Sequence, residues 1–169
     1  MSDARVPTYH LAQVNIGRTL APLTSEQLAG FVELLEPVNA LADASPGFVW
    51  RLQGEAGDAT EFKLRGDELL IVNMSVWESL DELGDFVFRT MHAEVMRRRR
   101  EWFERLREVY TCLWWVPEGH VPTVAEAEER LAELAADGPS PVAFTFQRPF
   151  PAPGVALPAQ RSDDWLCLV

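Results

Sequence analysis

The sequence predicts an α+β fold whose elements follow the order β-α-β-β-α-β, with one further α-β unit after them. Three observations predict it. Short apolar runs mark strands, and apolar residues three and four positions apart mark helices between them. Capping-box, glycine and proline signals divide these stretches. Because the 169 residues contain no long polar break, we expect a single domain over 1–146. Residues 147–169 contain four prolines and are expected to form an extended tail.

The first half of the chain is expected to supply three strands and one helix. The strands are predicted over 9–17, 47–53 and 68–77. Thr24 and Gln27 have the spacing of a capping box, in which the threonine oxygen accepts a backbone amide at the helix start. Pro37 is expected to kink or end this helix, because proline lacks the amide hydrogen and clashes with the preceding turn.

The second half is expected to supply the remaining helices and two more strands. Helical stretches are predicted from Glu78-Ser79 onward, over 91–107 as a second helix or a continuation, and from the capping box at Thr123 to Gly138-Pro139. The strands are predicted over 109–116 and 142–146. This order is the ferredoxin-like plan with an α-β unit added at its C-terminal end.

The third and fourth predicted strands carry apolar residues on both faces. A sheet with helices on one side needs only one apolar face, so a second layer must cover the other. Three helices could cover both faces, but a second sheet from a partner chain is the simpler arrangement. We therefore expect a symmetric homodimer in which two sheets form a dimeric α/β barrel.

Composition limits the classes of partner and compartment. The net charge of −11 argues against a nucleic acid as the main partner. No run approaches the roughly 18 apolar residues of a membrane helix. The first residues lack the basic and apolar parts of a secretory signal, and the two cysteines suggest no disulfide framework. We therefore expect a cytoplasmic protein with no membrane partner, in which Cys112 is a buried free thiol.

The charge is distributed unevenly along the chain. Residues 89–107 contain seven arginines and three glutamates, although the protein as a whole is acidic. Such a stretch either attracts an anionic ligand or pairs with acidic neighbours on a solvated face. The second arrangement is the more common one.

One helical face carries the most informative pattern. If the helix is continuous, spacings of four and three place six side chains on it: Phe88, His92, Val95, Arg99, Trp102 and Leu106. Only His92 and Arg99 on this face are polar, and burying a charge without a partner is costly. The pattern indicates a pocket where His92 acts as acid, base or metal ligand and Arg99 holds a carboxylate or phosphate. Alternatively, His92 bonds a backbone carbonyl and Arg99 extends to water.

Other polar residues are further candidates. Asn15 and Asn73 lie in apolar strands, and a buried asparagine must be hydrogen-bonded either to a ligand or within the sheet. Asn39 either orients a substrate or a water molecule, or caps the helix near its proline. His120 precedes a helix and is a candidate for the mouth of a site. The histidines lack the spacing of a zinc site, so no metal site is predicted.

The chain is also rich in tryptophan. Trp50, Trp102 and Trp114 suit the wall of a pocket for an aromatic or macrocyclic ligand, and they equally suit a filled core or a dimer seam. Trp114 and Trp115 must point to opposite faces of a regular strand. The sequence lacks the motifs of serine hydrolases, phosphate-binding loops and Rossmann oxidoreductases.

Several stretches resemble known families. Ser-Val-Trp-Glu-Ser at 75–79, with the helix after it, resembles antibiotic-biosynthesis and haem-degrading monooxygenases of the dimeric α/β-barrel superfamily. HLAQVN at 10–15, VNMSVWES at 72–79 and LWWVPEGHVPT at 113–123 resemble an uncharacterised bacterial family of that superfamily, over about 8–150. This second resemblance implies the fold and the dimer, and it implies no reaction.

The monooxygenase resemblance implies a site. In haem-degrading members, an asparagine on the first strand, an aromatic residue on the second helix and a helical histidine form the pocket. Asn15 matches the asparagine, Phe86 or Phe88 matches the aromatic residue, and His92 lies about one turn before the position of the histidine. Cofactor-free members oxidise phenolic, electron-rich substrates, so haem and a cofactor-free reaction are equally open.

We therefore expect a small-molecule enzyme of monooxygenase-like type, acting in a pocket between sheet and helices. The expected catalytic residues are His92, Asn15 and Arg99. The expected substrate-binding residues are Phe88, Trp102, Trp114, Trp50, Asn73 and His120. The alternatives are a lyase, isomerase or cyclase on the same fold and a non-catalytic protein that binds a small molecule or haem. The expected partners are a second copy of the chain and an aromatic or anionic small molecule.

Overall fold

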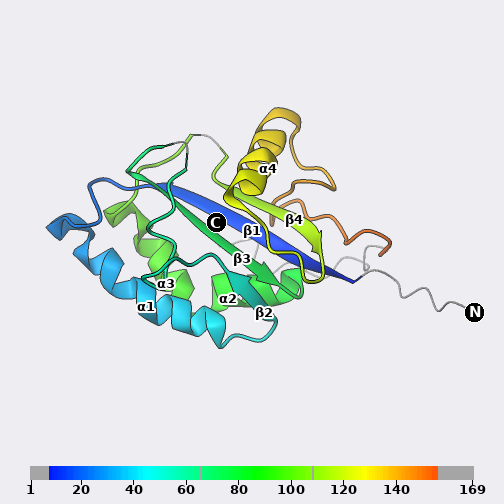
Figure 1. The fold of residues 1–169 in the computed structure, drawn as a ribbon, viewed down its shortest axis with the longest axis horizontal. Coiled ribbons are helices and arrows are strands. Elements are labelled where there is room, and N and C mark those ends of the chain that lie inside the picture. The colour runs from blue at the N-terminus through cyan, green and yellow to red at the C-terminus, as the bar shows by residue number, and fades with distance from the viewer. Residues whose placement is uncertain (1–7, 65, 108, 156–169) are drawn as a thin grey trace, which may run out of the picture.

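The computed structural model describes residues 8–64, 66–107 and 109–155, which form an α+β structure around one antiparallel sheet (Figure 1). The sheet contains β1 (Tyr9–Arg18), β2 (Phe48–Arg51), β3 (Leu70–Trp77) and β4 (Thr111–Pro117). Its strand order is β2-β3-β1-β4, so β1 pairs with β3 on one side and with β4 on the other. The predicted α+β class and the four main strands are therefore confirmed.

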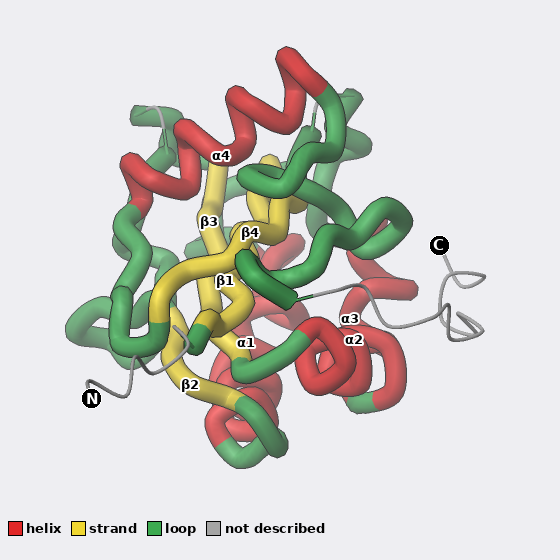
Figure 2. Tube along the Cα trace, turned by 90° about the vertical axis from the view of Figure 1, so that its right-hand side faces the viewer, coloured by secondary structure: helices red, strands yellow, loops and turns green. Residues whose placement is uncertain are grey.

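The helices cover the two faces of the sheet unequally. They are α1 (Ala29–Asp43), α2 (Leu80–Arg89), α3 (Met91–Arg98) and α4 (Val124–Asp137). The 3₁₀ turns η1 (Glu26–Leu28) and η2 (Arg99–Glu101) precede α1 and follow α3. Figure 2 shows α4 on one side of the sheet and α1, α2 and α3 on the other. We call the side under α4 the outer face and the opposite side the inner face.

The outer face is covered within the chain. Val14 of β1, Met74 of β3 and Trp114 of β4 point to this face and are almost fully buried against the apolar side of α4, which includes Leu131. Because α4 supplies the second covering layer, burial of this face does not require a second sheet. The homodimer stays a prediction, but the apolar strands no longer argue for it.

Two local signals in the first helix do not act as expected. The capping box at Thr24 does not form: the helical turn begins at Glu26, and the residue before it, Ser25, makes no side-chain cap. Pro37 does not end α1, which continues to Asp43. Pro37 is exposed, so the carbonyl that loses its helical partner lies on the solvent side, where water can bond it. Asn39 is consequently inside the helix and is not a cap.

The predicted helix over 91–107 is shorter than expected and separate from α2. Thr90 has an extended backbone between α2 and α3, and its hydroxyl accepts the His92 backbone amide while donating to the carbonyl of Phe86. Helical structure then ends at Glu101. A continuous helical face from Phe88 to Leu106 is therefore wrong, because Thr90 ends one helix and caps the next.

The predicted fifth strand over 142–146 is reduced to isolated bridges, of which one joins it to the sheet. Phe144 exchanges two backbone hydrogen bonds with Leu113 of β4, each 2.9 Å long. Residues 147–155 of the predicted tail contain neither helix nor strand, and the Phe150 carbonyl accepts the indole N–H of Trp115 at 2.8 Å. The apolar end of the tail, 165–169, lies outside the described residues. Within the described ranges, no helix is long and apolar enough to cross a membrane.

The two threonine capping boxes give a matched stability test. At α4 the Thr123 hydroxyl accepts the Glu126 backbone amide at 3.1 Å, as predicted. Thr123→Ala is expected to lower the free energy of unfolding by about 1 kcal/mol, because it leaves a helix-terminal amide without that partner. Thr24→Ala, at the exposed box that does not form, is expected to stay within about 0.5 kcal/mol. Urea unfolding followed by circular dichroism measures both, and equal losses would contradict the assignment.

Candidate functional site

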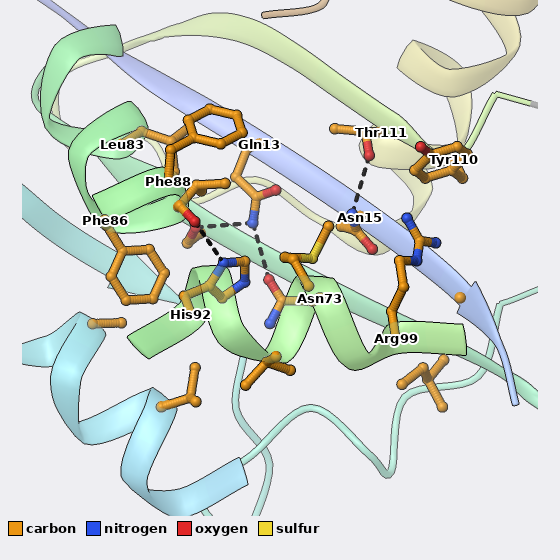
Figure 3. Close-up of a pocket in the computed structure, with 18 of the residues that line it drawn as sticks. Gln13, Asn15, Asn73, Leu83, Phe86, Phe88, His92, Arg99, Tyr110 and Thr111 are labelled. Carbon is orange, nitrogen blue, oxygen red and sulfur yellow. Dashed lines mark hydrogen bonds between the residues drawn. The ribbon is translucent and has the colours of Figure 1, made fainter. Parts of the chain in front are cut away.

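A cavity of about 520 Å³ lies between the inner face of the sheet and α1, α2 and α3 (Figure 3). Its walls are mainly apolar and include Phe31, Leu35, Val38, Phe86, Val95 and Met96. A volume of this size is typical of pockets that hold small organic molecules. The cavity is therefore the first place to look for function.

The floor of the cavity is polar although it belongs to the centre of the sheet. The Gln13 amide nitrogen donates to Asn73 Oδ1 at 2.9 Å and to Ser75 Oγ at 3.0 Å. The indole N–H of Trp77 donates to the same serine oxygen at 2.8 Å. The two Gln13 bonds join β1 to β3, and the three bonds together fix the orientation of side chains that face the cavity.

A second polar group lies further along β1. Asn15 Nδ2 donates to Thr111 Oγ1 on β4 at 3.0 Å. Next to it, the guanidinium of Arg99 lies over the ring of Tyr110, with 4.8 Å from Cζ to the ring centroid. Figure 3 shows these four residues at one end of the cavity, with His92, Gln13 and Phe86 toward the other.

His92 occupies the second position of α3, directly after the helix break. Its Nδ1 lies 3.3 Å from the carbonyl oxygen of Val87, and its ring lies 5.0 Å from that of Phe86. Because a carbonyl oxygen can only accept, this bond places the proton on Nδ1 and leaves the lone pair on Nε2. Burial lowers the pKa of His92, and the bond to Val87 offsets only part of that effect. His92 is therefore neutral at neutral pH and can accept a proton or bind a metal through Nε2.

The charges around the cavity are unusual for an acidic protein. Among its described lining residues there is no aspartate or glutamate, whereas three arginines line it: Arg51, Arg99 and Arg107. Arg51 is neutralised by Asp43, with 2.7 Å between Nε and Oδ1. The cavity therefore has a net positive lining in a chain of net charge −11.

The structure brings together five of the nine residues that were expected to act in catalysis or substrate binding. Asn15, Asn73, Phe88, His92 and Arg99 all line the cavity. They come from β1, β3, α2, α3 and η2, so they are distant in sequence and adjacent only in the fold.

The other four candidates lie elsewhere. Trp102 is 3% exposed and packs on Phe31 with ring centroids 5.8 Å apart, outside the cavity lining. Trp50 packs against the outer-face core. The remaining two, Trp114 and His120, both bond to Glu126 at the start of α4, at 2.9 and 2.7 Å. Burial raises the pKa of that carboxyl, but these hydrogen bonds and the charges of His120 and Arg130 together hold the pKa below its usual value.

Sequence reasoning missed three floor residues: Gln13, Ser75 and Thr111. The signal was present as polar residues two positions apart in two strands. The register pairs Gln13 with Ser75 and Asn15 with Asn73, so the four side chains share one face. The sequence does not show which strands pair. Without that knowledge, the polar residues of one strand could not be linked to those of the other.

Neither a cluster of metal-ligating side chains nor a reactive thiol is found among the described residues. No group of three or more histidine, cysteine, aspartate or glutamate side chains among the described residues could hold a metal ion. Cys112 is a buried free thiol, as predicted, and burial raises its pKa to about 12. Such a thiol is not a nucleophile at neutral pH.

Comparison with known proteins places the chain in a family. Residues 10–160 match the model of a domain of unknown function, DUF3291. The chain belongs to the DUF3291 family. Among solved structures, NE2512, a protein of unknown function from Nitrosomonas europaea, matches with 12% identity and a TM-score of 0.44. The match covers 70% of this DUF3291 chain and 97% of that one. No curated protein matches the chain.

The partly buried His92 of this DUF3291 protein makes its stability depend on pH. The pKa of His92 is about 6.5 when unfolded and lower when folded, so below pH 6.5 the unfolded state takes up a proton that the folded state does not. The free energy of unfolding is therefore expected to fall as the pH drops from 6.5 toward the folded pKa. His92→Gln is expected to flatten this dependence, and His10→Gln, which lies outside the cavity lining, to retain it. Urea titrations between pH 7.5 and 5 measure the slopes, and equal slopes in both variants would contradict the prediction.

Proposed function

We propose that this DUF3291 protein is a small-molecule enzyme whose substrate binds in the inner-face cavity, with His92 as its general base. The observation that carries the proposal is the bond from His92 Nδ1 to the Val87 carbonyl. It fixes the tautomer in which Nε2 has a free lone pair, and burial keeps the ring neutral. The apolar walls exclude water, and the amides of Gln13, Asn15 and Asn73 offer hydrogen bonds that orient a substrate.

Monooxygenase-like chemistry is the reaction we propose first. His92 Nε2 removes a proton from an activated CH₂ group of a phenolic substrate, which leaves an electron-rich anion. That anion reduces molecular oxygen without a further reductant, since conversion of CH₂ to a carbonyl consumes one O₂ and releases one water. The resemblance of Ser-Val-Trp-Glu-Ser at 75–79 to antibiotic-biosynthesis monooxygenases supports this reaction. A lyase, isomerase or cyclase would begin with the same proton transfer.

The strand order also supports the proposal, although it bears only on the fold and not on the reaction. The strand order β2-β3-β1-β4 is what a β-α-β-β-α-β chain forms in the ferredoxin-like plan, in which each parallel crossover leaves room for one strand between its ends. Membership of the dimeric α/β-barrel superfamily, including its homodimer, belongs to this proposal. Fold alone implies no activity, so the weight rests on His92 and the cavity around it.

Oxygen uptake with 1,8-dihydroxyanthrone, a phenolic ketone with an activated CH₂, tests the reaction. His92→Ala is expected to lower the enzymatic rate by about 10²–10⁴-fold, because the positioned base is lost. His120→Ala serves as the matched control, since this exposed histidine lies outside the cavity lining. A wild-type rate no higher than that of heat-inactivated protein would refute the oxygenase. If the CH₂ group then exchanges deuterium from D₂O in a His92-dependent manner, the non-redox alternative is supported instead.

Haem binding without turnover is a second candidate, and one observation favours it. A histidine that ligates iron commonly donates its other ring nitrogen to a carbonyl, which is the arrangement of His92 and Val87. His92 would hold the iron through Nε2, while Arg99 could neutralise a propionate. Bound haem would supply oxygen activation, and the side chains of this cavity would exclude water and position its edge.

A haem titration tests this candidate. Saturable growth of a Soret band in wild-type protein, its loss in His92→Ala and its retention in His120→Ala are the expected results. The physical reason is that only His92, of the two histidines compared, lies in the cavity with a free Nε2. A flat titration, or an unchanged band in His92→Ala, would remove haem from consideration.

A further inference from the structure

Arg99 is the one arginine of the run 97–100 that lines the cavity, and it has no carboxylate partner among the described residues. Arg97 pairs with Glu94, and Arg98 pairs with Glu101 at 2.9 Å, so these two arginines are neutralised on the surface. Arg99 instead lies partly buried over the Tyr110 ring. A partly desolvated cation is stabilised by an aromatic face, and considerably more by an anion.

The surroundings of Arg99 suit an anion as well. Thr111 Oγ1 accepts its hydrogen bond from Asn15, so its own hydroxyl hydrogen stays available to donate to a bound oxyanion. Figure 3 shows Thr111, Tyr110 and Arg99 together at the same end of the cavity. The described lining contains no carboxylate that would repel an anion or compete for the guanidinium.

The distance between Arg99 and His92 limits the length of the ligand. They are seven residues apart on α3 and η2, which is two helical turns, or about 10 Å along the axis at about 1.5 Å per residue. Between them the helix presents Val95 and Met96 to the cavity, and aromatic rings gather at the His92 end, including Phe86, Phe88 and Trp77. A ligand that reaches both ends therefore has an apolar, preferably aromatic, body.

We propose that the cavity binds an organic monocarboxylate, with its carboxylate on Arg99 and its aromatic end beside His92, about 10 Å away. This substrate class rests on the proposed function for its catalytic meaning, although binding can be measured without turnover. The planar guanidinium matches a carboxylate with two parallel hydrogen bonds, and Arg99 is the lining arginine held over an aromatic ring.

Calorimetric titration with 4-phenylbutanoate and its uncharged analogue 4-phenylbutanamide tests the assignment. Wild-type protein is expected to bind the carboxylate about 10- to 100-fold more tightly, as loss of a charge-assisted hydrogen bond predicts. Arg99→Gln is expected to remove this preference while amide binding changes little. Arg97→Gln removes the same charge from the same helix at an exposed position and is expected to retain the preference. Circular dichroism melts establish that each variant is folded.

Contrary results are distinguishable. Equal affinity of wild-type protein for the two compounds, or no saturable binding of either, would overturn the proposal without using any variant. Equal losses in Arg97→Gln and Arg99→Gln would show a long-range charge effect and also overturn it. Tighter binding of 3-phenylpropyl phosphate than of the carboxylate would replace the monoanion with a dianion. A carboxylate preference that depends on Arg99, in a protein with no His92-dependent turnover, would support this inference and refute the proposed enzyme.

Discussion

The pairing of β1 with both β3 and β4 is the constraint on which the rest of the structure depends. It makes β1, like β3, an inner strand with a neighbour on each side. The two-residue period of a strand then sends alternate side chains of β1 to opposite faces of the sheet. Val14 is driven under α4, while Gln13 and Asn15 are driven into the cavity. A slip of one residue would exchange these sets and bury two amides without partners beneath α4, so the register is strongly specified.

The second determinant is the helix break at Thr90, which divides one amphipathic stretch into α2 and α3 beside the cavity. Because α3 starts afresh there, His92 stands near a helix end, where its ring reaches back to the Val87 carbonyl of α2. The turn η2, which continues α3, carries Arg99 two turns later to the opposite end of the cavity. His92 and Arg99 are therefore held at a fixed spacing by α3 and η2, over a floor held by hydrogen bonds between strands. Rigid elements hold such geometry better than loops do.

Local signals in the sequence predicted the helix ends correctly where interactions between neighbouring residues determine the structure. The capping box at Thr123 formed, with the threonine hydroxyl accepting the Glu126 backbone amide. The similar box at Thr24 did not form, since the chain enters α1 through a 3₁₀ turn whose apolar Leu28 is buried against Phe31 and Trp102. Tertiary packing outweighs a cap that contributes about 1 kcal/mol. The same reasoning explains Pro37, because an exposed proline can be tolerated where the rest of its helix is packed.

The sequence by itself determined the α+β class, the four main strands and the alternation of faces along each strand. It also singled out His92 and Arg99, although the continuous helical face on which it placed them is wrong. These follow from periodicity, which acts over neighbouring residues. Only the tertiary structure decided that Gln13 and Ser75 meet beneath the cavity, that Trp50, Trp102 and Trp114 lie outside it, and that α4 covers the outer face. Each of these depends on contacts between segments far apart in the chain. Their pairing is selected by the total burial of the fold, which no local pattern encodes.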